Sequence, residues 1–227
     1  MTETGLKFYP GFPSLNSLVR DYLSGKEKAC AFFGGRHEDS GRIKALADKV
    51  DRRLDRSLVA ELLRSQSSFR HVSGGDERLC RFERENGFIV TTGQQPVLFG
   101  GPLYILYKAL TAVKLAERLE GLLGAPVLPV FWNASEDHDF EEISAIGLLD
   151  GANNLERVAL DPRPWNRSPA FMIQPGPEIE RVFSAFGKLI PQTEFSPWLN
   201  SILHESYTSG TNLGAAFGEL ISRLLGG

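Results

Sequence analysis

Cysteine is scarce in this sequence: Cys30 and Cys80 are the two that occur among 227 residues. Their spacing fits neither a disulfide framework nor a cysteine metal site, so a reducing cytoplasm is the expected location. No apolar run approaches the length of a membrane span. The opening residues M-T-E-T-G-L-K-F-Y-P also lack the basic and then apolar pattern of a signal peptide.

Neither sign of charge dominates, since 25 Lys and Arg face 28 Asp and Glu for a net charge of −3. There is therefore no electrostatic reason to expect nucleic acid or an anionic membrane as a partner. A glycine-rich phosphate loop that ends in Lys-Ser/Thr is missing as well, so no cofactor is evident and no ATP site is predicted. The composition, 42% hydrophobic and 23% charged, is that of an ordinary globular protein.

The most organised part of the sequence runs from Phe88 to Glu142. It opens with a β-prone run, residues 88–92, which is expected to stop at Gly93. A second apolar run at residues 127–132 is typical of a buried parallel strand. The pattern predicts a strand–helix–strand unit of an α/β fold.

The helix of this unit is expected to begin at Pro102, because proline is favoured at the first helical position. Apolar residues then recur at helical spacing, namely Leu103, Leu106, Leu110 and Val113. Gly121 and Gly124 are expected to end it.

Polar residues follow the carboxyl end of each predicted strand: Gly93-Gln94-Gln95 after the first and Glu136-Asp137-His138-Asp139 after the second. In an open α/β sheet this edge is where ligands bind. We therefore expect the functional site at this edge.

The acidic run holds five carboxylates and one histidine within seven residues, when Glu141 and Glu142 are included. Such a cluster indicates a cation, a protonated partner or proton transfer. His138, held by Asp137 or Asp139, is the predicted general base. Two alternatives stay open: a metal site, for which one histidine is a weak signature, and a solvated loop that caps the next helix. No metal is predicted.

Substrate contacts are expected from glutamine amides, from flexible glycines and from free N–H groups at the helix start. The predicted substrate-binding residues are Gly93, Gln94, Gln95, Gly100, Gly101, Tyr104, Asn133 and Glu136. Trp132 is expected to line the pocket or to lie in the core. Lys108 is close enough to the helix start to reach an anion, but a solvated lysine is the preferred interpretation.

The rest of the chain is expected to form a helical segment, residues 1–86, that packs on the first part of a Rossmann-like domain, residues 87–227. Apolar residues from Ile43 to Leu62 predict one or two amphipathic helices. Residues 65–86 are expected to be a loop with a short helix. After Glu142 we expect two strands around a turn at 150–154, and then a Pro-rich irregular excursion near 161–177. Three helices are expected to follow, at 177–189, at 196–206 and from the cap Thr211 to Leu225.

Two signatures carry a resemblance to a known family: T-G-Q-Q-P-V-L-F-G-G-P-L-Y-I-L-Y-K at residues 92–108 and P-V-F-W-N-A-S-E-D-H-D-F-E-E-I at residues 129–143. With these runs the chain resembles the cysteine-adding ligases of bacillithiol biosynthesis. The resemblance implies a Rossmann-like parallel sheet flanked by helices, related to nucleotidylyltransferases. The implied reaction joins cysteine to glucosaminyl-malate as an amide, with ATP to activate the carboxyl group.

Two departures bear on these expectations. Where nucleotidylyltransferases carry a histidine motif, this chain has Phe99-Gly100-Gly101-Pro102, as the family does. Family members are also much longer, so the resemblance implies an incomplete core with a homodimer or a missing C-terminal, coiled-coil half as partner. A truncated remnant or binding subunit without catalysis is the alternative function, and a nucleotidyltransferase is the third.

Overall fold

The computed structural model describes residues 16–51, 54–161, 165 and 167–226. The chain forms two compact units, Met1–Leu54 and Asp55–Gly227, and each is described by itself. The predicted domains, 1–86 and 87–227, use a different boundary. That division stays a prediction, because compactness alone does not define a domain that folds independently.

The first unit contains the helices α1 (Ser17–Leu23), α2 (Glu27–Phe32) and α3 (Ser40–Asp51). The Asn16 side chain caps α1 by accepting a hydrogen bond from the Leu18 N–H at 2.8 Å. The Arg42 guanidinium donates to the carbonyl oxygen of Phe33 at 2.6 Å, which ties α3 to the turn that precedes it.

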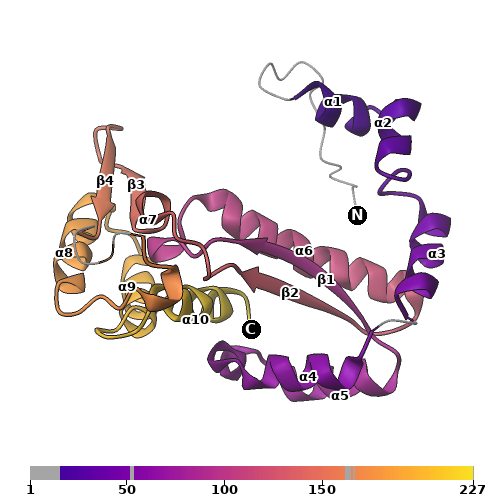
Figure 1. Cartoon of the computed structure of the whole chain (residues 1–227). Helices are drawn as coiled ribbons and strands as arrows, with labels where there is room; N and C mark the ends of the chain where they lie inside the picture. Colours follow the sequence, from indigo (N-terminus) through magenta and orange to yellow (C-terminus); the bar gives the residue numbers. More distant parts are fainter. Residues whose placement is uncertain (1–15, 52–53, 162–164, 166, 227) are drawn as a thin grey trace. The chain divides into compact units, whose positions relative to one another are not determined.

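The second unit is built on two parallel strands, β1 (Phe88–Gln94) and β2 (Val127–Asn133), with α6 (Leu103–Leu123) between them in sequence. Phe88 lies opposite Val127, and the register holds through to Gln94 opposite Asn133. In Figure 1, α6 runs along the two strands. The predicted strand–helix–strand unit is confirmed, with helices flanking a parallel sheet.

The first strand continues past Gly93, where the sequence was expected to turn. Gly93 is paired with Trp132, and a Cβ atom at this glycine would lie 2.8 Å from the Trp132 carbonyl oxygen. The glycine therefore allows two backbones to approach closely within the strand, and it does not end the strand.

The buried face of α6 consists mainly of alanine. Ala109, Ala112 and Ala116 are buried together with Ile105, whereas Leu103 is 59% exposed. Small side chains let the helix lie close to the strands. The residues that face the strands are therefore these alanines, and the stripe of leucines that the sequence suggested is not the buried face. The helix itself is confirmed.

Residues 56–84 are mostly helical: α4 (Arg56–Ser65), the 3-10 turn η1 (Ser67–His71) and α5 (Gly75–Arg84). One or two helices across Ile43–Leu62 were expected, and the structure has two, α3 and α4. Residues 65–86 were expected to be a loop with a short helix, and they are more helical than that, because η1 and α5 cover most of the segment. Only two apolar side chains of α5, Leu79 and Phe82, are buried, and the rest of the helix is strongly polar, so the segment resembles a loop in composition.

After β2 the chain forms α7 (Phe140–Ile143) and an antiparallel hairpin of β3 (Ala145–Leu149) and β4 (Leu155–Ala159). The Asp150 carboxylate stabilises the turn by accepting from the N–H groups of Ala152 and Asn154, each at 2.8 Å. The two strands and turn predicted here are confirmed.

The remaining elements are η3 (Ala170–Met172), α8 (Ile179–Leu189), α9 (Ser196–Ser206) and α10 (Leu213–Leu225). They confirm the three predicted helices. Part of the expected excursion, residues 162–164 and 166, lies outside the described residues. The cap of α10 is Asn212, which accepts from the Ala215 N–H at 2.8 Å, and not Thr211, whose hydroxyl bonds to Thr208.

Helix α10 is buried between two hydrophobic clusters. Leu213, Ala216 and Leu220 belong to the larger cluster, whereas Phe217 and Ile221 belong to the smaller one beside α6. Burying a side chain such as Phe217 contributes about 2 kcal/mol. Helix α10 therefore packs both on the sheet unit and on the elements between β2 and α10.

Candidate functional site

The two predicted polar clusters meet at the carboxyl edge of the sheet. The Gln95 side-chain amide donates a hydrogen bond to Asp137 Oδ2 at 2.7 Å. These residues are 42 positions apart in the sequence and follow neighbouring parallel strands. The parallel register places their strand ends side by side, so one side-chain bond joins both signatures.

Asp137 is held in its ionised form. Its carboxylate accepts from Gln95 and from the backbone N–H of Asp139, the latter at 3.1 Å. The Gln95 bond, followed by the Asp139 N–H, lowers the pKa of Asp137 below its ordinary value. This position therefore presents a fixed negative charge at neutral pH.

Lys108 reaches the end of β1 from α6. Its ammonium donates to the Gly93 carbonyl oxygen at 2.6 Å and to Gln94 Oε1 at 2.9 Å. The preferred interpretation of Lys108 as a solvated lysine is wrong. Side chains on a helix lean toward its N-terminus, and this rule is the signal that could have placed Lys108 near the end of β1.

His138, the predicted general base, is exposed, and its backbone N–H bonds to the Asp137 carboxylate, whereas its ring makes no hydrogen bond to a side chain of the described residues. Its neighbour Asp139 caps α7 by accepting from the Glu142 N–H at 3.4 Å. Glu136 is exposed too. The catalytic roles of His138, Asp137 and Asp139, and substrate binding by Glu136, stay predictions.

Asn133 points into the interior, where its amide donates to the Gly214 carbonyl oxygen at 2.7 Å. A Cβ atom at Gly214 would lie 2.7 Å from Cβ of Ser135. The start of α10 therefore packs directly on the loop after β2. Trp132, beside Asn133, is 63% exposed, which excludes it from the core.

Gly100 and Gly101 form a tight turn after η2 (Leu98–Gly100), with positive φ angles of 89° and 66°. Their N–H groups donate to the carbonyls of Val97 and Leu98 at 3.0 and 3.1 Å. Residues that carry a side chain rarely adopt these φ angles, so the turn favours glycine at both positions. The role of these glycines in substrate binding stays a prediction.

Tyr104 lines a cavity of about 420 Å³ between β1 and α6, and Lys108 lines it too. The cavity also contacts Thr91, Thr92 and Tyr107. The cavity adjoins the end of β1, and both Tyr104 and Lys108 therefore border it close to the predicted site. Gly93, Gln94 and Gln95 are half-buried, and they directly follow Thr92 in the sequence.

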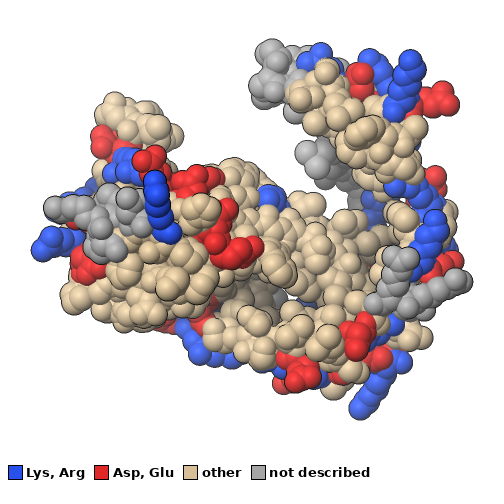
Figure 2. All heavy atoms as spheres, in the orientation of Figure 1, with Lys and Arg blue, Asp and Glu red and all other residues tan. Residues whose placement is uncertain are grey.

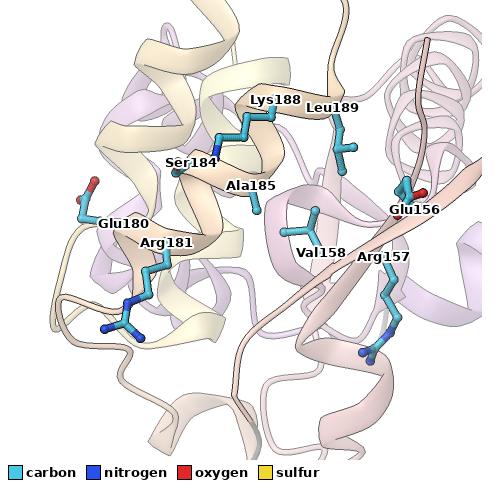
Figure 3. Close-up of a pocket in the computed structure, with 9 residues that line it drawn as sticks. All are labelled: Glu156, Arg157, Val158, Glu180, Arg181, Ser184, Ala185, Lys188 and Leu189. Carbon is cyan, nitrogen blue, oxygen red and sulfur yellow. The ribbon is translucent and has the colours of Figure 1, made fainter. Parts of the chain in front are cut away.

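A larger open hollow of about 690 Å³ lies between β4 and α8. Figure 3 shows Arg157 and Arg181 on opposite sides of it, with Val158 and Ala185 between them. It contains none of the predicted site residues. We place the candidate site at the strand ends, because charged and amide groups converge there.

In the described ranges, no three His, Cys, Asp or Glu side chains are grouped as metal ligands would be. None of the helices found there is long and apolar enough to cross a membrane. Figure 2 shows basic and acidic side chains intermixed on the face drawn.

A parallel strand–helix–strand unit with polar residues at its carboxyl edge defines a Rossmann-like α/β domain. Residues 6–227 match the family model described as "Bacillithiol biosynthesis BshC, N-terminal Rossmann-like domain". The chain belongs to this family.

Curated relatives named as cysteine ligase BshC are similar to the chain. The protein from Chlorobium phaeobacteroides is 37% identical over 82% of this chain and 34% of its own length. Those from Heliobacterium modesticaldum and Carboxydothermus hydrogenoformans are 43% and 30% identical over 64% and 92% of this chain. The chain spans 27–39% of the length of these relatives.

Proposed function

We propose that this chain supplies the substrate pocket and the proton acceptor of a ligase that joins cysteine to glucosaminyl-malate. The observation that carries the proposal is the Gln95–Asp137 hydrogen bond of 2.7 Å, which brings both family signatures into one site. The names of the relatives support the cysteine-ligating part of this reaction. Small substrates and a free thiol product fit a reducing cytoplasm.

In the proposed step, the sugar amine attacks the activated carboxyl carbon of cysteine. A carbon–nitrogen bond forms, the oxygen leaving group departs, and the amine proton passes to the exposed His138. The ionised Asp137 next to it stabilises the imidazolium that results. Histidine is the side chain that most often accepts a proton in such a step.

The resemblance implies ATP as the activating co-substrate. The described residues do not fit a nucleotide site of the usual kind: they include no phosphate loop, and Phe99-Gly100-Gly101-Pro102 lies where a histidine motif would be. We therefore assign to this chain only substrate binding and proton transfer.

The test uses the full-length Chlorobium phaeobacteroides relative, with alanine at the position that aligns with His138. Turnover should fall at least about 100-fold, because a general base contributes that much, while the melting temperature stays unchanged. Unchanged turnover would remove His138 from the mechanism. Absence of ligation by the unmodified relative would overturn the proposed function.

A binding subunit without catalysis is the second candidate. Exposed apolar residues favour it: Leu58 and Leu62 on α4 are 51% and 55% exposed. Such surfaces fit a protein partner or a longer chain. Purified alone, a binding subunit should bind glucosaminyl-malate without forming product, whereas ligation by the 227-residue chain would exclude this candidate.

A further inference from the structure

Lys108 has an unused hydrogen-bond donor at the candidate site. An ammonium has three N–H groups, and two of them are directed to Gly93 O and Gln94 Oε1. Both of these acceptors are neutral, and within the described ranges no carboxylate pairs with Lys108. A half-buried cation that lacks a negative partner attracts an anion more strongly than an exposed one.

The unused donor belongs to a side chain that lines the 420 Å³ cavity between β1 and α6. Tyr104, in the first turn of α6, lines the same cavity. That turn has Pro102 as its cap and no side-chain capping bond, so no capping side chain offsets the positive end of the helix dipole. Lys108 and the helix start therefore favour negative charge in one cavity.

The neighbouring glutamines separate this cation from the acidic loop. Gln94 accepts from Lys108, while Gln95 donates to Asp137. The Lys108 ammonium therefore lies on one side of the two glutamines, at the end of β1. The carboxylates of the acidic loop, which follows β2, lie on the other side. An anionic substrate group is expected on the Lys108 side, because the acidic loop repels it.

We propose that Lys108 binds a substrate carboxylate in the cavity between β1 and α6. The ammonium donates its third N–H to that carboxylate and keeps its bonds to Gly93 and Gln94. This inference rests on the proposed function only for the source of the carboxylate. Cysteine and the malate part of glucosaminyl-malate both carry one.

The test compares ligands that differ by the carboxylate, using calorimetry on the 227-residue chain. One pair is cysteine and cysteamine, and the other is glucosaminyl-malate and methyl glucosaminide. In at least one pair the unmodified chain should bind the carboxylate-bearing member about tenfold or more tightly, and Lys108→Met should abolish that preference. The pair that shows the effect identifies the source.

Lys108→Arg keeps the charge and should retain part of the preference, whereas Lys114→Met on the same helix should retain all of it. Lys114 is an exposed lysine that pairs with Glu117 at 2.9 Å, so it is a matched control. If Lys108→Met weakened both members of a pair equally, Lys108 would have a structural role only and the proposal would be overturned.

The absence of a carboxylate preference in the unmodified chain, or of any binding at millimolar concentration, would overturn the inference without use of the variant. This outcome is separate from that of the proposed function. Carboxylate binding can hold when a full-length relative shows no ligation. Equally, ligation can occur when Lys108 makes no contribution to binding.

Discussion

Residues 93–95 and residues 98–101 belong to one signature, and the structure uses them differently. The first group is half-buried and is held by side-chain bonds from Lys108 and to Asp137. The second group is almost wholly buried and is held by packing and by a glycine turn. A single motif therefore carries both a polar site and the anchor that fixes it to the core. Substitutions in the two groups should separate binding from stability.

The largest effect is expected for Phe99→Ala in the buried group. The Phe99 ring packs against Phe183, Phe186 and Tyr207, with centroids at 4.9, 5.1 and 5.1 Å. Its loss should reduce the free energy of unfolding by about 3–5 kcal/mol, measured by urea titration. Phe195→Ala is the control, since Phe195 is 64% exposed and should change little.

Gly101→Ala should cost about 2–3 kcal/mol, because an alanine there is strained and crowded. The φ angle is 66°, and the new Cβ would lie 2.7 Å from Cβ of Val97. Gly151→Ala is the matched control, as a Cβ there meets no atom within 4 Å. Equal melting temperatures for the two variants would contradict the strained turn.

Tyr207→Phe should cost about 1 kcal/mol, since it removes the buried hydroxyl that donates to the Val97 carbonyl oxygen at 3.1 Å. Burial raises the pKa of Tyr207, so in the unfolded chain it ionises first. The advantage of tyrosine should therefore narrow above about pH 10. Tyr107→Phe, at an exposed position, should show neither effect in chemical unfolding.

Gln95→Ala should change stability at neutral pH least, by about 0.5 kcal/mol, because its bond is only half-buried and lies outside the core. The bond lowers the pKa of Asp137, so its contribution is present at neutral pH and is lost as pH falls through that lowered pKa. The free energies of unfolding of the unmodified chain and of Gln95→Ala should therefore approach each other as the pH falls below about 4. Divergence there would show that Asp137 is not held by Gln95.

The strand–helix–strand unit could be predicted because its signals are local: a β-prone run and a continuous apolar run for the strands, Pro102 at the helix start and glycine at its end. The approach of Gln95 to Asp137 followed from the rule that parallel strands share a carboxyl edge. The site was therefore predictable as a place in the fold. The bond itself depends on the register, which the sequence does not state.

Other features depended on tertiary packing and were missed. The buried face of α6 is set by how closely alanines let it approach the strands. Helix α5 has few buried apolar residues and a strongly polar composition, so it was taken mostly for a loop. Lys108 was underestimated because the position of Nζ depends on both the helix orientation and the end of β1.

The contact between Gly214 and Ser135 has a consequence for any survey of variants. A side chain at position 214 would displace the loop that carries Asp137, although Gly214 itself is buried and has no side chain that could act on a substrate. Loss of function at this position would then look like loss of a catalytic residue. In a deep mutational scan Gly214 would mark a distance that must be kept short.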